Sequence, residues 1–513
     1  MAVENLMAIM NQNTQQFVAS AIVKKELELQ VGNPVKLKQA TGGAPLTVHV
    51  GPAPIQEALN DSQLSHEVFF DIQKRGDFSN NQILAIAKSF REKIGHLAVQ
   101  PNLKRALVDE GESLAEFFEV RDMSLDVKNE NDVYVKVQKP VVLCKNLPDF
   151  ILRILKERGL EHVIVFKKYG MDGGGSFFKI CLNVFKDESV SSPEKKKTAS
   201  SSRSAAKFKD SGVKKLLLIA VVEGVPETYS NVQMILNALN IEFIDFSLAS
   251  DLKLCNIACG MQGHSSSFPC MYCLSKRPFL EKGVLRTFGM LRQLAKAFKQ
   301  SNGKDAKPYY STVNEPLLKF SDEILVLDKI PPPELHIHLG VTNKFVDVIS
   351  EKWGNDNMSN FLSRFNIQRE PFRGKNLNGN NCVKFLQHVM DLEKALPGHL
   401  VQYAEALKHF DKVRKACFGN ELDPNYRQLI KNFEGACTHL KIVKFSKLHI
   451  LVDHVADFIE RKQKPLGFYS EQASESVHAD FQKTWDHYKR ATSNPVYGNH
   501  LYRAVLRYNK KHL

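Results

Sequence analysis

The apolar positions in the middle of the chain follow the pattern of β-strands separated by tight turns. Residues 162–185, HVIVFKKYGMDGGGSFFKICLNVF, are rich in apolar positions on both sides of Gly173-Gly174-Gly175, which predicts a β-hairpin with Asp172 at the end of its first strand. The run KKLLLIAVV predicts a buried third strand, SNVQMILNALN a helix, and IEFIDFSLAS a fourth strand that delivers Asp251. This order predicts an α/β sheet from which two carboxylates emerge.

The chain before this sheet is predicted to be mainly helical. Residues 1–60 combine a polar N-terminal helix with a linker rich in Gly and Pro. Residues 61–160 form a helical N-terminal region, in which Ile83, Ala87 and Phe90 recur at helical spacing and the last part is a strand followed by a helix. The helices of this region could form a three-helix DNA-binding unit or a plain packing module.

Composition and charge narrow the class of protein. The 513 residues are 43% hydrophobic and 25% charged, which is typical of a globular protein with two to four folded units. The net charge of +14 favours a polyanionic partner, since Lys and Arg release counterions from nucleic acid, although an ordinary basic surface is the alternative. Nine scattered cysteines without a secretory signal indicate a reducing compartment, and no apolar run of about 18 residues predicts a membrane span.

Residues 186–213 separate the second and third predicted strands. They are rich in Ser and Lys and contain almost nothing to bury, so we predict a disordered basic insertion. Its lysines are candidates for phosphate contacts or a nuclear import signal, and a solvated loop is the alternative.

Asp172 and Asp251 are candidate ligands for a hard divalent cation. The predicted order of strands matches an RNase H-like core, in which carboxylates on adjacent strand ends bind metal together with a third carboxylate from a later helix. In YSEQASESVHADFQKTWDHYKR, an apolar stripe lies opposite a face that carries Glu471 and Glu475. We choose Glu475 as the third carboxylate, with Glu471 as the fallback and a solvated acidic face as the alternative.

A second group of residues has the spacing of a zinc site. Cys270 and Cys273 form a C-x-x-C pair, and His449 and His454 lie five residues apart far downstream. Two thiolates and two imidazoles complete the tetrahedral shell that zinc prefers. The alternative is a local four-cysteine site that adds Cys255 and Cys259, with His264 as a further candidate ligand; both cysteines also suit a small-residue core position.

Together these motifs resemble the catalytic region of Transib-type DDE transposases and of the V(D)J recombinase catalytic subunit. The resemblance covers roughly residues 160–490. It rests on Asp172 in GMDGGGSF, the spacing from Asp251 to Cys270-Met-Tyr-Cys273, Leu335-His336 in PELHIHLGVTNKF, and the interval from His449 to Glu475.

The resemblance implies a fold and a division of the chain. It implies an RNase H-like mixed sheet core in residues 161–274, interrupted by a large helical, zinc-clipped insertion at residues 275–448. Residues 449–490 then carry the zinc-binding histidine pair and the catalytic glutamate helix, and residues 491–513 form a basic C-terminal tail that is a candidate DNA contact.

The resemblance also implies residue roles and an activity. Asp172, Asp251 and Glu475 would bind Mg²⁺ or Mn²⁺, Cys270, Cys273, His449 and His454 would bind Zn²⁺, and His336 would lie close to the catalytic pocket. The implied activity is cleavage and strand transfer at double-stranded DNA ends, in the nucleus, by a homodimer with or without an accessory protein. A host-retained derivative that binds DNA without cutting it is the alternative.

Two features depart from the family pattern. The acidic helix reads S-E-Q-A-S-E where the family pattern is one residue shorter, which leaves Glu471 and Glu475 both open. The first 160 residues contain no recognisable module that reads a transposon end.

Overall fold

The computed structural model describes residues 31–37, 46–51, 63–76, 78–93, 98–99, 102–174, 176–186, 213–241, 245–371, 374 and 376–513. The chain divides into two compact units. The first contains residues 1–118 and 481–511, and the second contains residues 119–480 and 512–513. The boundary at residue 118 differs from the boundary that we predicted at residue 160, and it leaves every candidate metal ligand in the second unit.

The first unit is a helical cluster closed by the C-terminal helix. Its three early helices are α3 (His66–Gly76), α4 (Asn80–Lys93) and α5 (Leu103–Glu112), and they bury apolar side chains such as Phe69, Ile83 and Leu107. The predicted basic tail is largely helix α21 (Tyr497–His512), whose Tyr508 is fully buried against Phe481 with ring centroids 5.8 Å apart. The tail is therefore part of a packed core, and its tyrosines are not all free for DNA.

Residues 32–60, which we predicted as linker, include a strand pair. Strand β1 (Val31–Leu37) pairs antiparallel with β2 (Leu46–Gly51). The Gly and Pro residues that indicate a linker are equally typical of turns and bulges, and the register shift between Val31 and Asn33 lies beside Gly32. A second short pair, β3 (Gln63–Leu64) with β4 (Ala98–Val99), is parallel.

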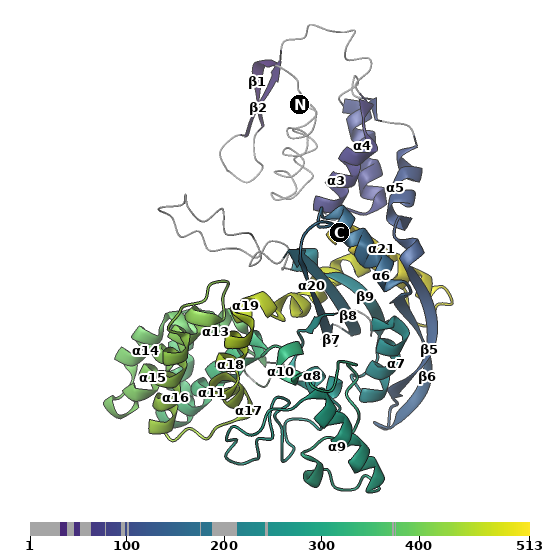
Figure 1. Cartoon of the computed structure of the whole chain (residues 1–513). Helices are drawn as coiled ribbons and strands as arrows, with labels where there is room; N and C mark the ends of the chain where they lie inside the picture. The colour runs from purple at the N-terminus through teal and green to yellow at the C-terminus, as the bar shows by residue number, and fades with distance from the viewer. Residues whose placement is uncertain are drawn as a thin grey trace. The chain divides into compact units, whose positions relative to one another are not determined.

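The second unit is built on a six-stranded mixed sheet, which confirms the predicted α/β class (Figure 1). The strand order is β10-β7-β8-β9-β6-β5. The strands are β5 (Phe118–Lys128), β6 (Tyr134–Cys144), β7 (Val165–Asp172), β8 (Phe177–Lys186), β9 (Leu217–Glu223) and β10 (Ser247–Leu248). The pairs β7/β8, β8/β9 and β6/β9 are antiparallel, whereas β10 joins β7 in parallel. The predicted hairpin around Gly173–Gly175 is thus confirmed as β7 and β8.

Residues 61–160, predicted to be mainly helical with one strand before the last helix, contain two sheet strands, β5 and β6. The first half of β6 is exposed and the buried positions of β5 are irregularly spaced, so neither shows the alternation that identifies a half-buried strand. The two strands are identified instead by their pairing in the sheet, where β6 pairs with β9 and β5 lies beside β6. The predicted fourth strand is also shorter than expected, since only Ser247 and Leu248 pair with β7.

Local capping explains where the helices beside the sheet begin. Helix α6 (Leu147–Glu157) starts at Asn146, whose side chain accepts from the amide of Asp149, and α7 (Tyr229–Leu239) starts at Thr228 in the same way. Helix α7 ends at Asn240, which adopts the left-handed conformation with φ 49°. Both helices were predicted from their apolar stripes, and the structure confirms them.

The predicted helical interval 275–448 is helical along most of its length. Its longest helix is α11 (Glu334–Trp353), and the end of the interval passes into α17, which carries His449. The other helices from residue 275 onward are α9 (Phe288–Gln300), α10 (Val326–Lys329), α12 (Asn355–Arg364), α13 (Gly379–Gln387), α14 (Val389–Ala395), α15 (Val401–Cys417), α16 (Tyr426–His439), α17 (Ser446–Asp453), α18 (Val455–Lys462), α19 (Leu466–Tyr469) and α20 (Gln472–Asp486). The short strands β11 (Arg369–Glu370) and β12 (Asn376–Leu377) pair antiparallel.

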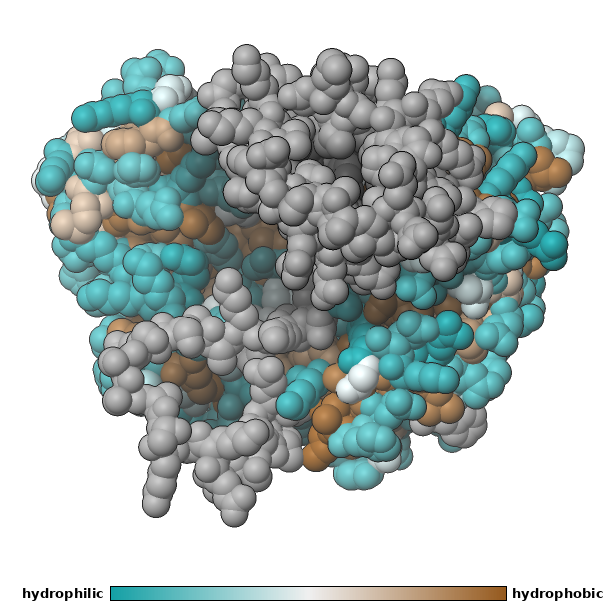
Figure 2. All heavy atoms as spheres, turned by 90° about the horizontal axis from the view of Figure 1, so that it is seen from above, coloured by the Kyte–Doolittle hydropathy of each residue, from teal (hydrophilic) through white to brown (hydrophobic). Residues whose placement is uncertain are grey.

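The surface of the described residues is mainly hydrophilic in the view of Figure 2, where brown apolar residues lie singly or in small groups. Among the residues that the structure describes, no helix combines the length and apolar character needed to cross a membrane. The predicted basic insertion at residues 186–213 lies, apart from its two end residues, outside the described part of the chain.

Candidate functional site

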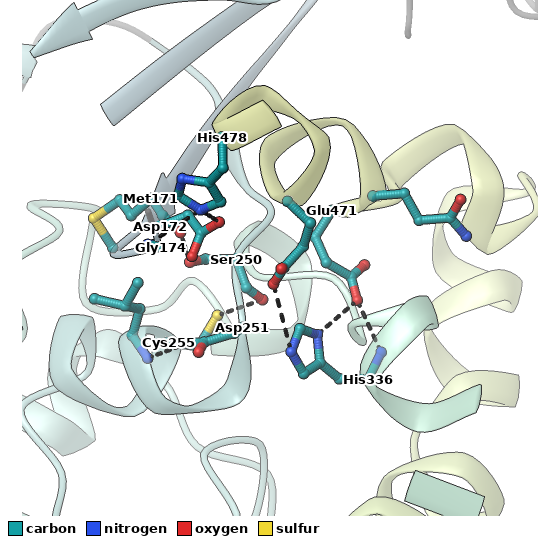
Figure 3. Close-up of polar contacts among 12 residues, drawn as sticks. Met171, Asp172, Gly174, Ser250, Asp251, Cys255, His336, Glu471 and His478 are labelled. Carbon is teal, nitrogen blue, oxygen red and sulfur yellow. Dashed lines mark hydrogen bonds and ion pairs between the residues drawn. The ribbon is translucent and has the colours of Figure 1, made fainter. Parts of the chain in front are cut away.

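The parallel pairing of β7 and β10 brings the two predicted aspartates to one edge of the sheet. The amide of Ala249 donates to the carbonyl of Tyr169 at 2.8 Å, and the hydroxyl of Ser250 donates to the carbonyl of Met171 at 2.5 Å. Asp172 ends β7 and Asp251 follows Ser250, so both leave adjacent parallel strands in the same direction (Figure 3). The two predicted aspartates therefore follow neighbouring parallel strands at the same edge of the sheet.

Asp251 has a structural role as well as its place at this edge. It is the N-cap of α8 (Leu252–Ala258), where its Oδ1 accepts from the amide of Leu254 at 2.6 Å. Burial raises the pKa of Asp251, and the charge of Asp172 raises it further, while the Leu254 amide and His336 oppose the shift. The cap fixes the carboxylate, and its coupling to Asp172 places the two charges in one electrostatic neighbourhood.

Glu475 lies in the field of both aspartates. It is half-buried in the first turn of α20, and its pKa rises to about 7 because of burial and the charge of Asp172, with smaller contributions from Asp251 and Glu471. The Oε1 atom of Glu475 lies 3.6 Å from Nε2 of His336. Several negative groups that repel one another in a partly buried site are the electrostatic setting that a bound cation would relieve.

Glu471 is occupied by contacts within the protein. It is 2% exposed, and its Oε1 accepts from the backbone amide of His336 at 3.1 Å and lies 3.2 Å from Nδ1 of the same residue. Of the two glutamates that the sequence left open, Glu471 therefore holds the start of α11, and Glu475 is the better candidate for a cation ligand.

His336 lies between the two glutamates, as the third residue of α11. Burial lowers its pKa, but the hydrogen bond to Glu471 and the charges of Glu471, Glu475 and Asp251 outweigh burial and raise the pKa overall. The imidazole therefore favours its positive form and offsets part of the negative charge of the carboxylates, close to the position that the sequence analysis expected.

Two lysines inside the sheet support the site, and neither was singled out from the sequence. Lys168 on β7 is 2% exposed and donates to the carbonyl of Ser470 at 2.8 Å, at the entry to α20. Lys179 on β8 is the cross-strand partner of Asp172 and is 1% exposed. Burial lowers the pKa of each lysine to about 8, opposed by nearby anionic groups. A lysine within a run of buried strand residues is a signal in the sequence that could have indicated these two positions.

A close approach fixes α20 against β7. A side chain at Gly170 would collide with the hydroxyl of Ser474, so glycine at this position lets the helix lie directly on the strand. Together with the Lys168 contact, this packing determines where Glu475 lies relative to Asp172.

The four predicted zinc ligands come together in one buried cluster. Among the described residues, Cys270, Cys273, His449 and His454 are the one group of three or more such ligands whose donor atoms all lie within 4.8 Å of one another. The sulfur of Cys270 lies 3.4 Å from Nε2 of His454, that of Cys273 3.4 Å from Nε2 of His449, and the two Nε2 atoms 3.2 Å apart. A tetrahedral zinc with ordinary bond lengths would space its ligand atoms by about 3.3 to 3.8 Å. The cluster could therefore bind zinc.

Surrounding groups orient these ligands. Nδ1 of His449 lies 2.6 Å from a carboxylate oxygen of Asp453, the arrangement that directs the other ring nitrogen of a histidine toward a metal. The fully buried Arg286 donates through Nε to the carbonyls of Cys270 and Cys273, at 3.0 and 3.1 Å. The backbone of the C-x-x-C pair is thus held by the guanidinium of Arg286, a residue that no sequence motif indicated.

The alternative four-cysteine site does not form. Cys255 and Cys259 are buried, and Cys255 donates to the carbonyl of Ser250 at 3.4 Å, outside the cluster of four ligands. His264 is also outside the cluster and lies 3.4 Å from the side-chain amide of Asn256. These residues fill space near the two sites without belonging to the metal cluster.

No family model matches the chain, and no curated protein matches it significantly.

Proposed function

We propose that this protein is a DDE-type DNA transposase or recombinase that cleaves phosphodiesters and transfers strands at DNA ends. The observation that carries the proposal is the position of Asp172 and Asp251 at the ends of the parallel neighbours β7 and β10, with Glu475 in their field. An RNase H-like interpretation of the six-stranded sheet, with three antiparallel strands and a parallel strand beyond the first, supports it. So does the zinc-type cluster, which would clip the helical insertion to the core.

The donor set fits Mg²⁺ or Mn²⁺. Carboxylate oxygens are the ligands that these hard cations prefer, and a bound cation would offset the burial and the neighbouring negative charge that raise the pKa values of Asp251 and Glu475. Asp172, Asp251 and Glu475 would hold the ions. Two such ions supply a polarised phosphate and an activated oxygen nucleophile for in-line displacement.

The chain's own residues would position this chemistry. The cap on α8 fixes one oxygen of Asp251, and the packing of α20 on β7 sets the position of Glu475. His336 would orient Glu475 and offset its charge before ions bind. A basic protein of net charge +14 would draw the DNA backbone toward the site, and a homodimer would bring two DNA ends together.

A nicking assay tests the proposal. Purified protein is incubated with labelled fragments that include candidate element ends, in Mg²⁺ or Mn²⁺, and nicks and strand-transfer products are resolved on a denaturing gel. We expect Asp172→Asn and Asp251→Asn each to reduce cleavage at least about 100-fold, because a lost metal ligand removes several kcal/mol of transition-state stabilisation. Asp132→Asn is the matched control, since this aspartate is 84% exposed at a turn.

The outcomes separate the two classes of function. Cleavage that depends on both aspartates but not on Asp132 supports the enzyme. Salt-sensitive DNA binding without cleavage by the wild type supports instead a host-retained derivative that binds DNA. Cleavage that persists in both variants would contradict the assignment of the site.

A further inference from the structure

His478 contacts Asp172, although it is not one of the three proposed metal ligands. It lies three residues after Glu475 on α20, so the two side chains share a face of the helix. Its Nε2 atom contacts Oδ2 of Asp172, and Figure 3 shows the ring directed at this carboxylate. The helix that brings Glu475 to the sheet edge therefore also brings an imidazole onto the first aspartate.

Lys179 determines which nitrogen of His478 carries the proton. The Nζ atom of Lys179 lies 2.5 Å from Nδ1 of His478 and 3.2 Å from the carbonyl of Gly174. An ammonium group only donates and the carboxylate of Asp172 only accepts, so these two contacts favour a ring proton on Nε2. That proton points at Asp172. The amide of Gly174 also donates toward Nε2, at 3.1 Å, and this contact opposes the Nε2–H tautomer.

The turn after β7 is shaped to receive this ring. A side chain at Gly174 would collide with the imidazole of His478, and one at Gly173 would collide with the carboxylate of Glu227. Glycine at position 174 thus makes room for His478 beside Asp172, whereas the Glu227 carboxylate is the end of a flexible side chain that could move away from position 173.

We propose that His478 is a positioning residue for Asp172. Its Nε2–H donates to Oδ2, so that the carboxylate is held with its other oxygen available to a divalent cation, and Lys179 fixes the tautomer that makes this donation. The inference rests on the proposed metal-dependent function. In the Nε2–H tautomer His478 positions Asp172 and is not itself a metal ligand.

Metal binding and ring tautomer test the proposal separately. Mn²⁺ is titrated by calorimetry into zinc-loaded wild type, His478→Leu, His478→Gln and Asp251→Asn, with zinc content and Tm recorded for each. We expect His478→Leu to weaken Mn²⁺ binding about 10- to 100-fold, the usual effect of losing a group that orients a ligand. His478→Gln retains an N–H donor and should stay much closer to the wild type. In parallel, ¹⁵N NMR of histidine-labelled protein without Mn²⁺ should show His478 as the Nε2–H tautomer.

Each outcome supports or overturns the inference. Weaker binding in His478→Leu with recovery in His478→Gln, at unchanged zinc content, supports it. Unchanged or tighter Mn²⁺ binding in His478→Leu, or an Nδ1–H tautomer, overturns the role of His478 while leaving the three carboxylates as a metal site. If the wild type shows no saturable Mn²⁺ binding that Asp251→Asn removes, the proposed metal-dependent function fails, and the positioning role fails with it.

Discussion

Glu471 and Glu475 lie about one helical turn apart, yet their surroundings give them different tasks. Glu471 is buried and accepts hydrogen bonds from His336, so its charge is used within the fold. Glu475 is repelled by Asp172, Asp251 and Glu471, and this repulsion is only partly offset by His336. An uncompensated charge of this kind costs stability and is typical of a functional site.

The two glutamates should therefore respond in opposite ways to neutralisation. At pH 8 and without divalent cations, Glu475→Gln should raise Tm by removing repulsion, while cleavage in Mn²⁺ is lost. Glu471→Gln should lower Tm, because the amide of His336 loses a charged acceptor. Thermal unfolding of both variants in chelator-free buffer, which leaves zinc in place, measures the difference. Equal shifts in the same direction would contradict these assignments.

Glu334 is a buried carboxyl group at the start of α11. Burial raises its pKa to about 8, with the charge of Glu471 as a further cause. Its folded pKa lies above the unfolded value of 4.5, so the neutral acid contributes stability below pH 4.5, and this contribution is lost as pH rises through 8.

Glu334→Gln removes this dependence. Relative to the wild type, the variant should gain free energy of unfolding between pH 5 and pH 8, on the order of a few kcal/mol. Urea unfolding at the two pH values gives the double difference. Glu460→Gln is the control, because this glutamate is 62% exposed and should show no such gain. If the difference in free energy of unfolding between Glu334→Gln and the wild type is the same at pH 5 and pH 8, Glu334 of the wild type is already ionised at pH 5.

At the scale of elements, the C-x-x-C knuckle and the short helices α17 and α18 meet at four buried ligands far apart in sequence. The knuckle supplies Cys270 and Cys273, α17 supplies His449, and His454 lies between α17 and α18. Helices α17 and α18 are eight residues each, too short to be stable in isolation, so a bound metal would add to the stability that packing gives them.

Zinc content distinguishes the observed cluster from the four-cysteine alternative. Cys273→Ser should lose the bound zinc, whereas Cys259→Ser should retain one zinc per chain. Loss of zinc should lower Tm and speed hydrogen exchange in α17 and α18, because their ligands then lose a shared partner. Elemental analysis and exchange mass spectrometry measure these effects. Zinc retained in Cys273→Ser but lost in Cys259→Ser would contradict the cluster.

The strand assignments at this scale followed from apolar pattern only where strands are buried on both faces. Strands β8 and β9 bury nearly every residue, β7 buries its last five residues, and all three were predicted from sequence. In the region of β5 and β6 only one strand was predicted, because half of β6 is exposed and its pairing with β9 is a contact between distant segments. Local pattern carries no information about such pairing.

At the scale of the whole molecule, the excess of 14 positive charges is the property most relevant to DNA. It predicts binding that weakens with salt, with a slope that reports the number of phosphates neutralised by the protein. Lys195, Lys196 and Lys197 form the densest cluster of the basic insertion, in a segment outside the described residues.

Replacing these three lysines by Ala should weaken DNA binding regardless of sequence. The slope of log affinity against log salt should fall by up to about 3, at about 0.9 for each phosphate that the variant no longer neutralises. Fluorescence anisotropy from about 50 to 200 mM salt measures this slope. Ala at Lys128, Lys282 and Lys415, each ion-paired at the surface, is the control with the same change in charge. Identical slopes for the two triple variants would show that these lysines of the insertion do not contact the phosphate backbone of the DNA.

The sequence by itself determined the residue types and most of the local elements: the hairpin with Asp172 at its first strand end, the buried strand β9, and the C-x-x-C and histidine pairs whose chemistry suits zinc. These follow from short-range periodicity and ligand preference. Only the tertiary structure decided that Glu471 is held by His336, that the histidines meet the cysteines, and that His478 and Lys179 surround Asp172. Most of these contacts join residues separated by more than a hundred positions, and their strength depends on burial, which no local pattern specifies.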